Sequence, residues 1–461
     1  MQRYSFERIL LPEGWAHQVS VGVSDDGFIT HIEPNPTSGL DNSEPIRGIA
    51  IPGMANAHSH AFQRAMAGNT EFRTGTRDSF WTWRLAMYAL ANRIEPDELQ
   101  ILAAQLFVEM LKAGYTAVAE FHYLHRRSDG SRFGNGNALW DAITAAATEV
   151  GIALTFLPTL YQASDFGAKP LKSEQRRFAM DTDEFLRAVQ QRLGAEQARP
   201  NSALRTGVAF HSLRAVSLDT MGIATRALLQ MDANLPLHVH IAEQTKEVQA
   251  CKKEFGIRPI DLLLQSGLVA RNWCLVHATH ASPQEIAGIA AAQATVCVSI
   301  TTEANLGDGF FDTHRFVNGG GRLCVGSDSQ ISVSPSEELR WLEYQQRLRK
   351  RRRGVLASEA EPHVGTRLWR DSARYGAGAI GQPAGEIAVG KRADWLILDP
   401  SHPTMVGAGA AAVDHLVFAG GAAAIRDVMV AGRWVIRDWR HKEEIAVSRR
   451  FAELVNRLAI S

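Results

Sequence analysis

The sequence predicts an α/β protein built on a (β/α)8 TIM-like barrel, with a small β-sandwich domain assembled from both termini. Between residues 49 and 380, short apolar runs alternate with amphipathic helical stretches, the pattern of βα units. About eight such runs occur, which is the number that closes this barrel. Strand-like segments with turns flank the region on both sides, so we assign residues 1–48 and 381–461 to the β-sandwich.

The N-terminal part of the predicted β-sandwich contains a hairpin signal. Two runs of alternating polarity, residues 18–23 and 28–32, are separated by a turn that includes Asp25-Asp-Gly27. Similar patterns return near the other end of the chain, at residues 393–398 and 427–436. We therefore expect the two ends to share one domain beside the barrel.

The barrel strands are predicted in chain order. The first precedes His58, and the others begin at residues 116, 153, 205, 237, 273, 294 and 322. In this fold the chemistry lies at the carboxyl ends of the strands. The polar residues that close these runs are therefore the candidates for a site: His58, His60, Glu120, His122, Tyr123, His211, His238, His240, His277 and Asp328.

Composition argues against several classes of partner. The chain has 49 basic and 49 acidic residues among 461, so no net charge favours nucleic acid or an acidic membrane. One basic run, residues 347–353, lies at the end of a predicted helix. It could be a solvated helix end or a nucleic-acid patch, and the charge neutrality of the chain favours the solvated helix end. The four cysteines show no C-x-x-C spacing, and the N-terminus lacks a secretory pattern. We expect reduced thiols, a cytoplasmic protein and no membrane span.

Two histidine pairs indicate a metal site. Side chains alternate along a strand, so His58 and His60 project the same way, and neutral imidazole is a favoured zinc ligand. His240 and Asp328 complete an N₃O shell with a position left for water. Glu243, three residues beyond His240, can reach the same mouth as a proton carrier, and His277 can stabilise a tetrahedral intermediate.

These motifs resemble the amidohydrolase superfamily, and specifically its mononuclear deaminase branch. The resemblance rests on His58-x-His60, His240-x-x-Glu243, His277 and Ser327-Asp328, and on the stretches 51–60 and 385–394. It implies the barrel and the split β-sandwich. The binuclear branch carries a bridging lysine at the fourth strand, and residues 153–162 contain none. One divalent metal ion, Zn²⁺, is therefore expected, with Asp328 taking a proton from water and Glu243 delivering protons to the leaving nitrogen.

Four further stretches, residues 61–68, 78–84, 120–123 and 210–214, resemble the formimidoylglutamate deiminases. The resemblance implies deimination of N-formimino-L-glutamate in histidine degradation, a homodimer, and a pocket lined by Gln63, Arg84, Tyr123, His211 and Arg214. Arginine also binds carboxylates in bidentate fashion, which suits a small-molecule dicarboxylate. The alternatives are a deaminase of a purine or another heterocyclic amine, and a non-catalytic binding protein of the same fold.

Overall fold

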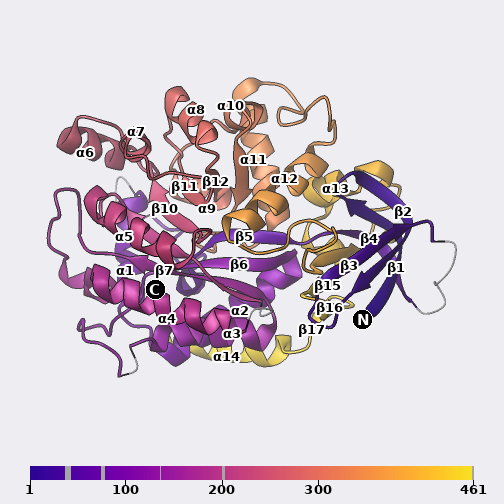
Figure 1. The fold of residues 1–461 in the computed structure, drawn as a ribbon, viewed down its shortest axis with the longest axis horizontal. Helices are drawn as coiled ribbons and strands as arrows, with labels where there is room; N and C mark the ends of the chain where they lie inside the picture. Colours follow the sequence, from indigo (N-terminus) through magenta and orange to yellow (C-terminus); the bar gives the residue numbers. More distant parts are fainter. Residues whose placement is uncertain (37–42, 74–77, 135, 200–202, 459–461) are drawn as a thin grey trace.

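A parallel barrel occupies the centre of the molecule in the computed structural model, which describes residues 1–36, 43–73, 78–134, 136–199 and 203–458 (Figure 1). Its strands neighbour one another in chain order, and a parallel bridge from Ser59 to Asp328 joins the last to the first. They are β5 Met54–Ser59, β6 Tyr115–His122, β7 Ala153–Leu160, β9 Val208–Ser212, β10 Leu237–Ile241, β11 Trp273–His277, β12 Thr295–Val298 and β13 Arg322–Val325. The predicted (β/α)8 barrel is confirmed.

Helices surround the barrel and bury their apolar stripes against it (Figure 1). They are α1 Phe80–Ala91, α2 Pro96–Ala113, α3 Ala138–Val150, α4 Thr182–Gln197, α5 Leu218–Met231, α6 Thr245–Phe255, α7 Pro259–Gln265, α8 Pro283–Ala291, α9 Ile300–Leu306, α10 Thr313–Asn318, α11 Pro335–Lys350 and α12 Val364–Ala379. The helix α2 illustrates the local rules, because proline occupies its first turn and Gly114, at φ 104°, ends it. That turn leads directly into β6.

One predicted strand is divided in the structure. The run from residue 205 to 210 forms β8 Leu204–Thr206, which pairs only with β7, and then β9. Gly207 separates them, at a place where a Cβ atom would lie 2.5 Å from Leu157 Cδ2. Close packing against β7 therefore demands glycine at this position and interrupts the run.

The second sheet draws its strands from both ends of the chain, as predicted. Its order is β17-β16-β15-β14-β4-β1-β2-β3. The members are β1 Gln2–Leu11, β2 Gly14–Val23, β3 Ile29–Pro34, β4 Glu44–Pro52, β14 Trp395–Leu398, β15 Ile425–Val430, β16 Arg433–Arg437 and β17 Arg440–His441. A separate apolar core fills it, in which Tyr4 and Phe6 meet Trp395 edge-on at 5.5 and 5.2 Å. The domain division at residues 49 and 381 stays a prediction.

The last elements are short, except the C-terminal helix. The helix α13 is Ala412–His415, and α14 Glu444–Leu458 packs on α2.

None of the described helices is both long and apolar enough to cross a bilayer. All four cysteines are buried free thiols, as expected. The basic run 347–353 covers the end of α11, as predicted, and Arg347 pairs there with Glu343 at 2.7 Å.

A buried ion pair connects the terminal sheet to the start of the first barrel strand, β5. Asp394 accepts bonds from Arg392 Nε at 2.9 Å and Nη2 at 2.5 Å, and from the backbone N–H of Ala431 at 2.8 Å. Its own carbonyl accepts from Gly53, just before β5. Arg392 and Asp394 are 3% and 2% exposed. The stretch 385–394 that carries part of the family resemblance therefore ends in a structural clamp.

We expect Asp394→Leu to lower the free energy of unfolding by about 3–5 kcal/mol, because it leaves the Arg392 cation buried without an acidic partner. Chemical denaturation followed by circular dichroism measures this loss. The matched control is Lys169→Gln, which breaks an exposed pair with Asp165 and should cost less than about 1 kcal/mol. Equal effects of the two substitutions would contradict the structural role of the Arg392–Asp394 pair.

Candidate metal centre and substrate pocket

Four predicted ligands converge at the carboxyl end of the barrel. His58 and His60 come from β5, His240 from β10, and Asp328 follows β13. Their ligand atoms all lie within 4.8 Å of one another. His58 Nε2 is 3.1 Å from His240 Nε2 and 3.2 Å from Asp328 Oδ1, which is 3.4 Å from His60 Nε2. The edge of a tetrahedral zinc site with bonds of 2.0–2.1 Å is roughly 3.3 Å, so these spacings fit a metal ion.

The histidine tautomers also fit a metal ion. His60 Nδ1 lies 2.8 Å from the carbonyl of Phe121, and His240 Nδ1 lies 2.8 Å from that of His211. A carbonyl accepts only, so each Nδ1 carries the hydrogen and each Nε2 presents its lone pair inward. Burial lowers the pKa of His60 to about 3 and lowers that of His240 as well. Both rings are therefore neutral, as metal ligation requires.

Hydrogen bonds between β5 and the segment after β13 hold the ligands in place. The backbone N–H of Asp328 donates to the His58 carbonyl at 3.0 Å, and that of His60 donates to the Asp328 carbonyl at 3.2 Å. Behind them, the Gln330 amide donates to Ser59, whose hydroxyl donates to Glu120 at 2.7 Å. Burial raises the pKa of Glu120 to about 8. Glu120 thus supports β5 and is not among the pocket-lining residues.

His277 lies between three carboxylates. Its Nε2 is 3.8 Å from Asp328 Oδ2 and 3.9 Å from Glu243 Oε1, while its Nδ1 is 3.3 Å from Glu303 Oε1. Burial alone would lower the pKa of His277, but Glu243, Glu303 and Asp328 raise it to about 10. The imidazole is therefore a cationic donor that points into the site. Sequence reasoning missed Glu303, which lies on α9, five residues after the end of β12.

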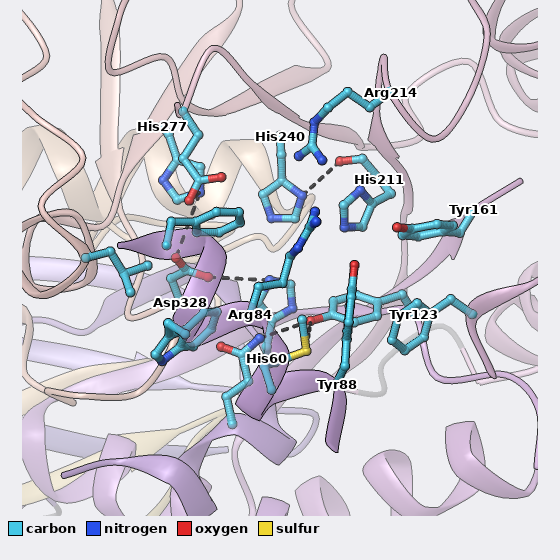
Figure 2. Close-up of a pocket in the computed structure, with 17 residues that line it drawn as sticks. His60, Arg84, Tyr88, Tyr123, Tyr161, His211, Arg214, His240, His277 and Asp328 are labelled. Carbon is cyan, nitrogen blue, oxygen red and sulfur yellow. Dashed lines mark hydrogen bonds and ion pairs between the residues drawn. The ribbon is translucent and has the colours of Figure 1, made fainter. Parts of the chain in front are cut away.

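The predicted substrate residues line one pocket beside the ligands (Figure 2). Gln63 donates from Nε2 to the Tyr123 hydroxyl at 3.0 Å, and its Oε1 has no partner in the described part of the chain. Arg84, His211 and Arg214 face the same space. Two tyrosines that the sequence analysis did not select, Tyr88 and Tyr161, complete this wall.

Some strand-end residues point elsewhere. His238 donates from Nε2 to the carbonyl of Ala379 at 2.9 Å, and His122 donates from Nε2 to the carbonyl of Leu124 at 2.7 Å. Neither ring lines the pocket. Both histidines are fully buried among packed side chains, so their role is structural.

The two pocket arginines, the half-buried Arg84 and the buried Arg214, make no ion pair within the described residues. Within the described residues, neither the Arg84 nor the Arg214 guanidinium has an Asp or Glu oxygen within 4.0 Å, and each Nε is buried without a hydrogen bond. Both instead lie over the ring of Trp81, at 4.5 and 6.0 Å from its centre. Trp81 thus contacts both guanidiniums through its ring. Burial alone would lower the pKa of Arg214, but the Glu247 and Glu243 carboxylates raise it without making an ion pair with the guanidinium, so both arginines keep hydrogen-bonding capacity for an anionic ligand.

The arrangement agrees with comparison to known proteins. The family model described as amidohydrolase family matches residues 49–435. The chain belongs to the amidohydrolase family. It is 47% identical over 453 residues, 98% of both chains, to a formimidoylglutamate deiminase of Pseudomonas aeruginosa. A 5-methylthioadenosine/S-adenosylhomocysteine deaminase of Shouchella clausii is 25% identical, covering 92% of this chain and 90% of the relative.

Solved structures support the same fold. An amidohydrolase from Brucella melitensis superposes with a TM-score of 0.92 and 38% identity, covering 99% of this chain and 100% of that one. A zinc-bound adenosine deaminase from Xanthomonas campestris has a TM-score of 0.82 at 19% identity, covering 100% and 99%, which bears on the fold alone.

The amidohydrolase holds one cluster suited to a divalent metal. Within the residues that the structure describes, His58, His60, His240 and Asp328 are the single group of three or more potential ligands. The strand β7 carries no lysine that could bridge a second ion. The donor set of three imidazoles and one carboxylate leaves room for water.

Proposed function

We propose that this amidohydrolase hydrolyses N-formimino-L-glutamate to N-formyl-L-glutamate and ammonia. The observation that carries the proposal is that the half-buried Arg84 and the buried Arg214 make no ion pair within the described residues and lie in the pocket that holds the metal ligands. Guanidinium groups bind carboxylates in a planar, bidentate fashion, which a dicarboxylate substrate can satisfy. The close similarity to a formimidoylglutamate deiminase supports the same substrate.

The residues around the pocket suit hydrolysis of a carbon–nitrogen double bond. A divalent metal, when bound, lowers the pKa of water toward neutrality. Asp328 Oδ2, on the His277 side of the carboxylate, accepts the proton of the attacking water. The His277 cation stabilises the tetrahedral adduct that forms at the formimino carbon. Glu243 gives one proton to the substrate nitrogen as the adduct forms, and then takes the proton of the adduct hydroxyl and passes it to the same nitrogen, so that the carbon–nitrogen bond breaks and ammonia leaves. The proton held by Asp328 then returns to Glu243 and restores both groups.

Glu243 has the acidity that this role needs. Burial raises its pKa to about 7, while His277 opposes the shift. A carboxyl group that titrates near neutral pH can both accept and release a proton during turnover. Glu243 lies within the pocket, 5% exposed, so its proton is exchanged with substrate and not freely with solvent.

We further propose zinc as the metal, a cytoplasmic location and a homodimer. The N₃O donor set favours zinc among common divalent ions. Four reduced, buried thiols suit a reducing compartment. The dimer follows from the family resemblance, and light scattering of the purified protein measures it. Elemental analysis measures the metal.

A substrate panel read by ammonia release tests the proposed reaction. We expect turnover of N-formimino-L-glutamate and none of adenosine, guanine or S-adenosylhomocysteine. A flat base would leave both arginines without an anion, which costs several kcal/mol. Turnover of a purine in preference to formiminoglutamate would favour the alternative hypothesis, a deaminase of heterocyclic amines, and would overturn the proposal.

Replacement of either pocket arginine should impair substrate binding more than metal binding. We expect Arg84→Met and Arg214→Met each to raise KM by about 10- to 100-fold, the loss of one charge-assisted hydrogen-bonded contact. Metal content should stay unchanged, because neither side chain is a ligand. A control, Arg192→Met, removes a half-buried cation that lies over Phe156, outside the pocket, and should leave KM unchanged.

A further inference from the structure

Two tyrosines in the pocket have no part in the steps described above. Tyr88 lies on α1, and Tyr161 directly follows β7. Both line the pocket with Arg84 and Arg214 and are 5% and 3% exposed. Figure 2 shows their phenol oxygens directed toward the interior of the pocket. Burial raises the pKa of Tyr161 above its ordinary value, so its phenol keeps the hydrogen at neutral pH.

A buried glutamine behind the pocket contacts both phenols. Gln175 lies on the 3₁₀ helix Ser173–Phe178, is 2% exposed and does not line the pocket. Its Nε2 lies 2.8 Å from the Tyr161 hydroxyl and 3.2 Å from the Tyr88 hydroxyl. Its Oε1 lies 3.1 Å from the backbone nitrogen of Lys172.

The contact with Lys172 determines which way the amide faces. A backbone N–H only donates, so the amide oxygen must lie on that side and the NH₂ group must face the tyrosines. Gln175 therefore donates one hydrogen to each phenol oxygen. A phenol whose oxygen accepts in this way directs its own hydrogen elsewhere. Even where one phenol donates to the other, the second hydrogen is left for the pocket.

The wall that contains Arg84 and Arg214 consequently offers donors. Two guanidiniums and the phenol hydrogens converge there, and the buried Nε of each arginine has no partner within the described residues. Carboxylates are pure acceptors with about four lone-pair sites, whereas a base or an alcohol presents donors as well. A wall of donors selects for a carboxylate by leaving any donor group of a wrong ligand unpaired.

We propose that Tyr88 and Tyr161 form a pair of specificity residues that presents a phenol hydrogen to a carboxylate of the substrate, and that Gln175 is the positioning residue that turns this hydrogen into the pocket. The inference deepens the proposed function and rests on it for the identity of the dicarboxylate. The geometry itself concerns only carboxylate recognition.

Tyr88→Phe and Tyr161→Phe test the donors. We expect each to raise KM for formiminoglutamate by about 10-fold, the value of a hydrogen bond to a charged group, with kcat changed less than about 3-fold. The control is Tyr115→Phe, at another buried tyrosine that lies outside the pocket and whose hydroxyl has no hydrogen-bond partner in the described part of the chain. It should leave KM unchanged. The same effect on all three variants, or none on the pocket pair, would overturn the assignment.

A substrate series locates the contact. N-formimino-L-norvaline lacks the side-chain carboxylate of the substrate, and N-formimino-4-aminobutyrate lacks the α-carboxylate. The penalty of the tyrosine variants should disappear for one analogue and persist for the other. A penalty that persists for both analogues would mean that the hydroxyls act on packing and not on a carboxylate.

Gln175→Met tests the positioning role, because it keeps the length of the side chain and removes both donors. We expect a KM increase of about 3- to 10-fold on its own, and no further increase when it is added to the Tyr88→Phe/Tyr161→Phe double variant. Gln346→Met, at a buried glutamine outside the pocket, is the matched control. Additive effects of Gln175→Met and the double variant would contradict action through the tyrosines.

Calorimetric binding of glutarate separates this inference from the proposed reaction. Wild-type protein that binds glutarate but releases no ammonia from formiminoglutamate would end the proposed function alone. Binding weakened about 10-fold in the two tyrosine variants would still support the donor assignment. Binding unchanged in both variants would overturn it, whatever the activity.

Discussion

Glu243→Gln should lower kcat by about 10²–10⁴-fold, the range for loss of a positioned acid–base group, while the metal stays bound. Glutamine keeps the shape of the side chain but cannot carry a proton from water to the leaving nitrogen. The residue is outside the ligand group His58, His60, His240 and Asp328, so metal content should be unaffected. Steady-state kinetics with formiminoglutamate and elemental analysis of the same sample measure both quantities.

Binding of an unreactive ligand controls for damage to the pocket. Glutarate should bind the Glu243→Gln variant as tightly as it binds wild type, because the variant alters proton transfer and not the arginine wall. A variant with near-normal kcat would remove Glu243 from the mechanism. A variant that had lost its metal would instead assign Glu243 to ligation.

His240→Ala should abolish both metal binding and activity, because it removes one of four ligands that lie within 4.8 Å of one another. Loss of an imidazole leaves three donors, and we expect metal affinity to fall at least about 100-fold, the upper range for loss of even an outer-shell partner. Removal of metal from wild type with a chelator should likewise abolish ammonia release, and added zinc should restore it.

His238→Ala is the matched control for this substitution. His238 lies two residues away on the same strand and is equally buried, but its Nε2 contacts the Ala379 carbonyl. We expect this variant to be less stable and to retain metal and turnover. If His238→Ala lost the metal while His240→Ala kept it, the ligand assignment would be wrong.

Local patterns predicted the framework of this protein because they depend on near neighbours. Alternation along a strand places His58 and His60 on one side, whatever the rest of the chain does. The alternation of strand and helix patterns predicted the barrel, and the strand patterns at both ends of the chain predicted the shared terminal sheet; the structure confirms both. Gly207 shows the limit of such patterns, since its packing against Leu157 divides a run that looks continuous.

Local sequence patterns did not predict the contacts between distant parts of the chain. Glu303 orients His277 from the helix α9, and only the closed barrel brings the two side chains to 3.3 Å. The same holds for Gln175. Its neighbours in the sequence are charged, as on a solvent-exposed segment, but its buried amide contacts both Tyr88 of α1 and Tyr161 after β7. No local periodicity marks a buried amide that serves two other residues.

The sequence by itself therefore determined the architecture, the ligand types and the order in which they occur along the chain, because strand periodicity and the placement of polar residues at strand ends are local properties. The tertiary structure alone decided which histidines face the metal cluster and which, like His238, bind a carbonyl elsewhere. It also decided which cations lack an anion and which way the hydroxyls point. Hydrogen-bond direction, burial and pKa depend on the whole set of neighbours that folding assembles.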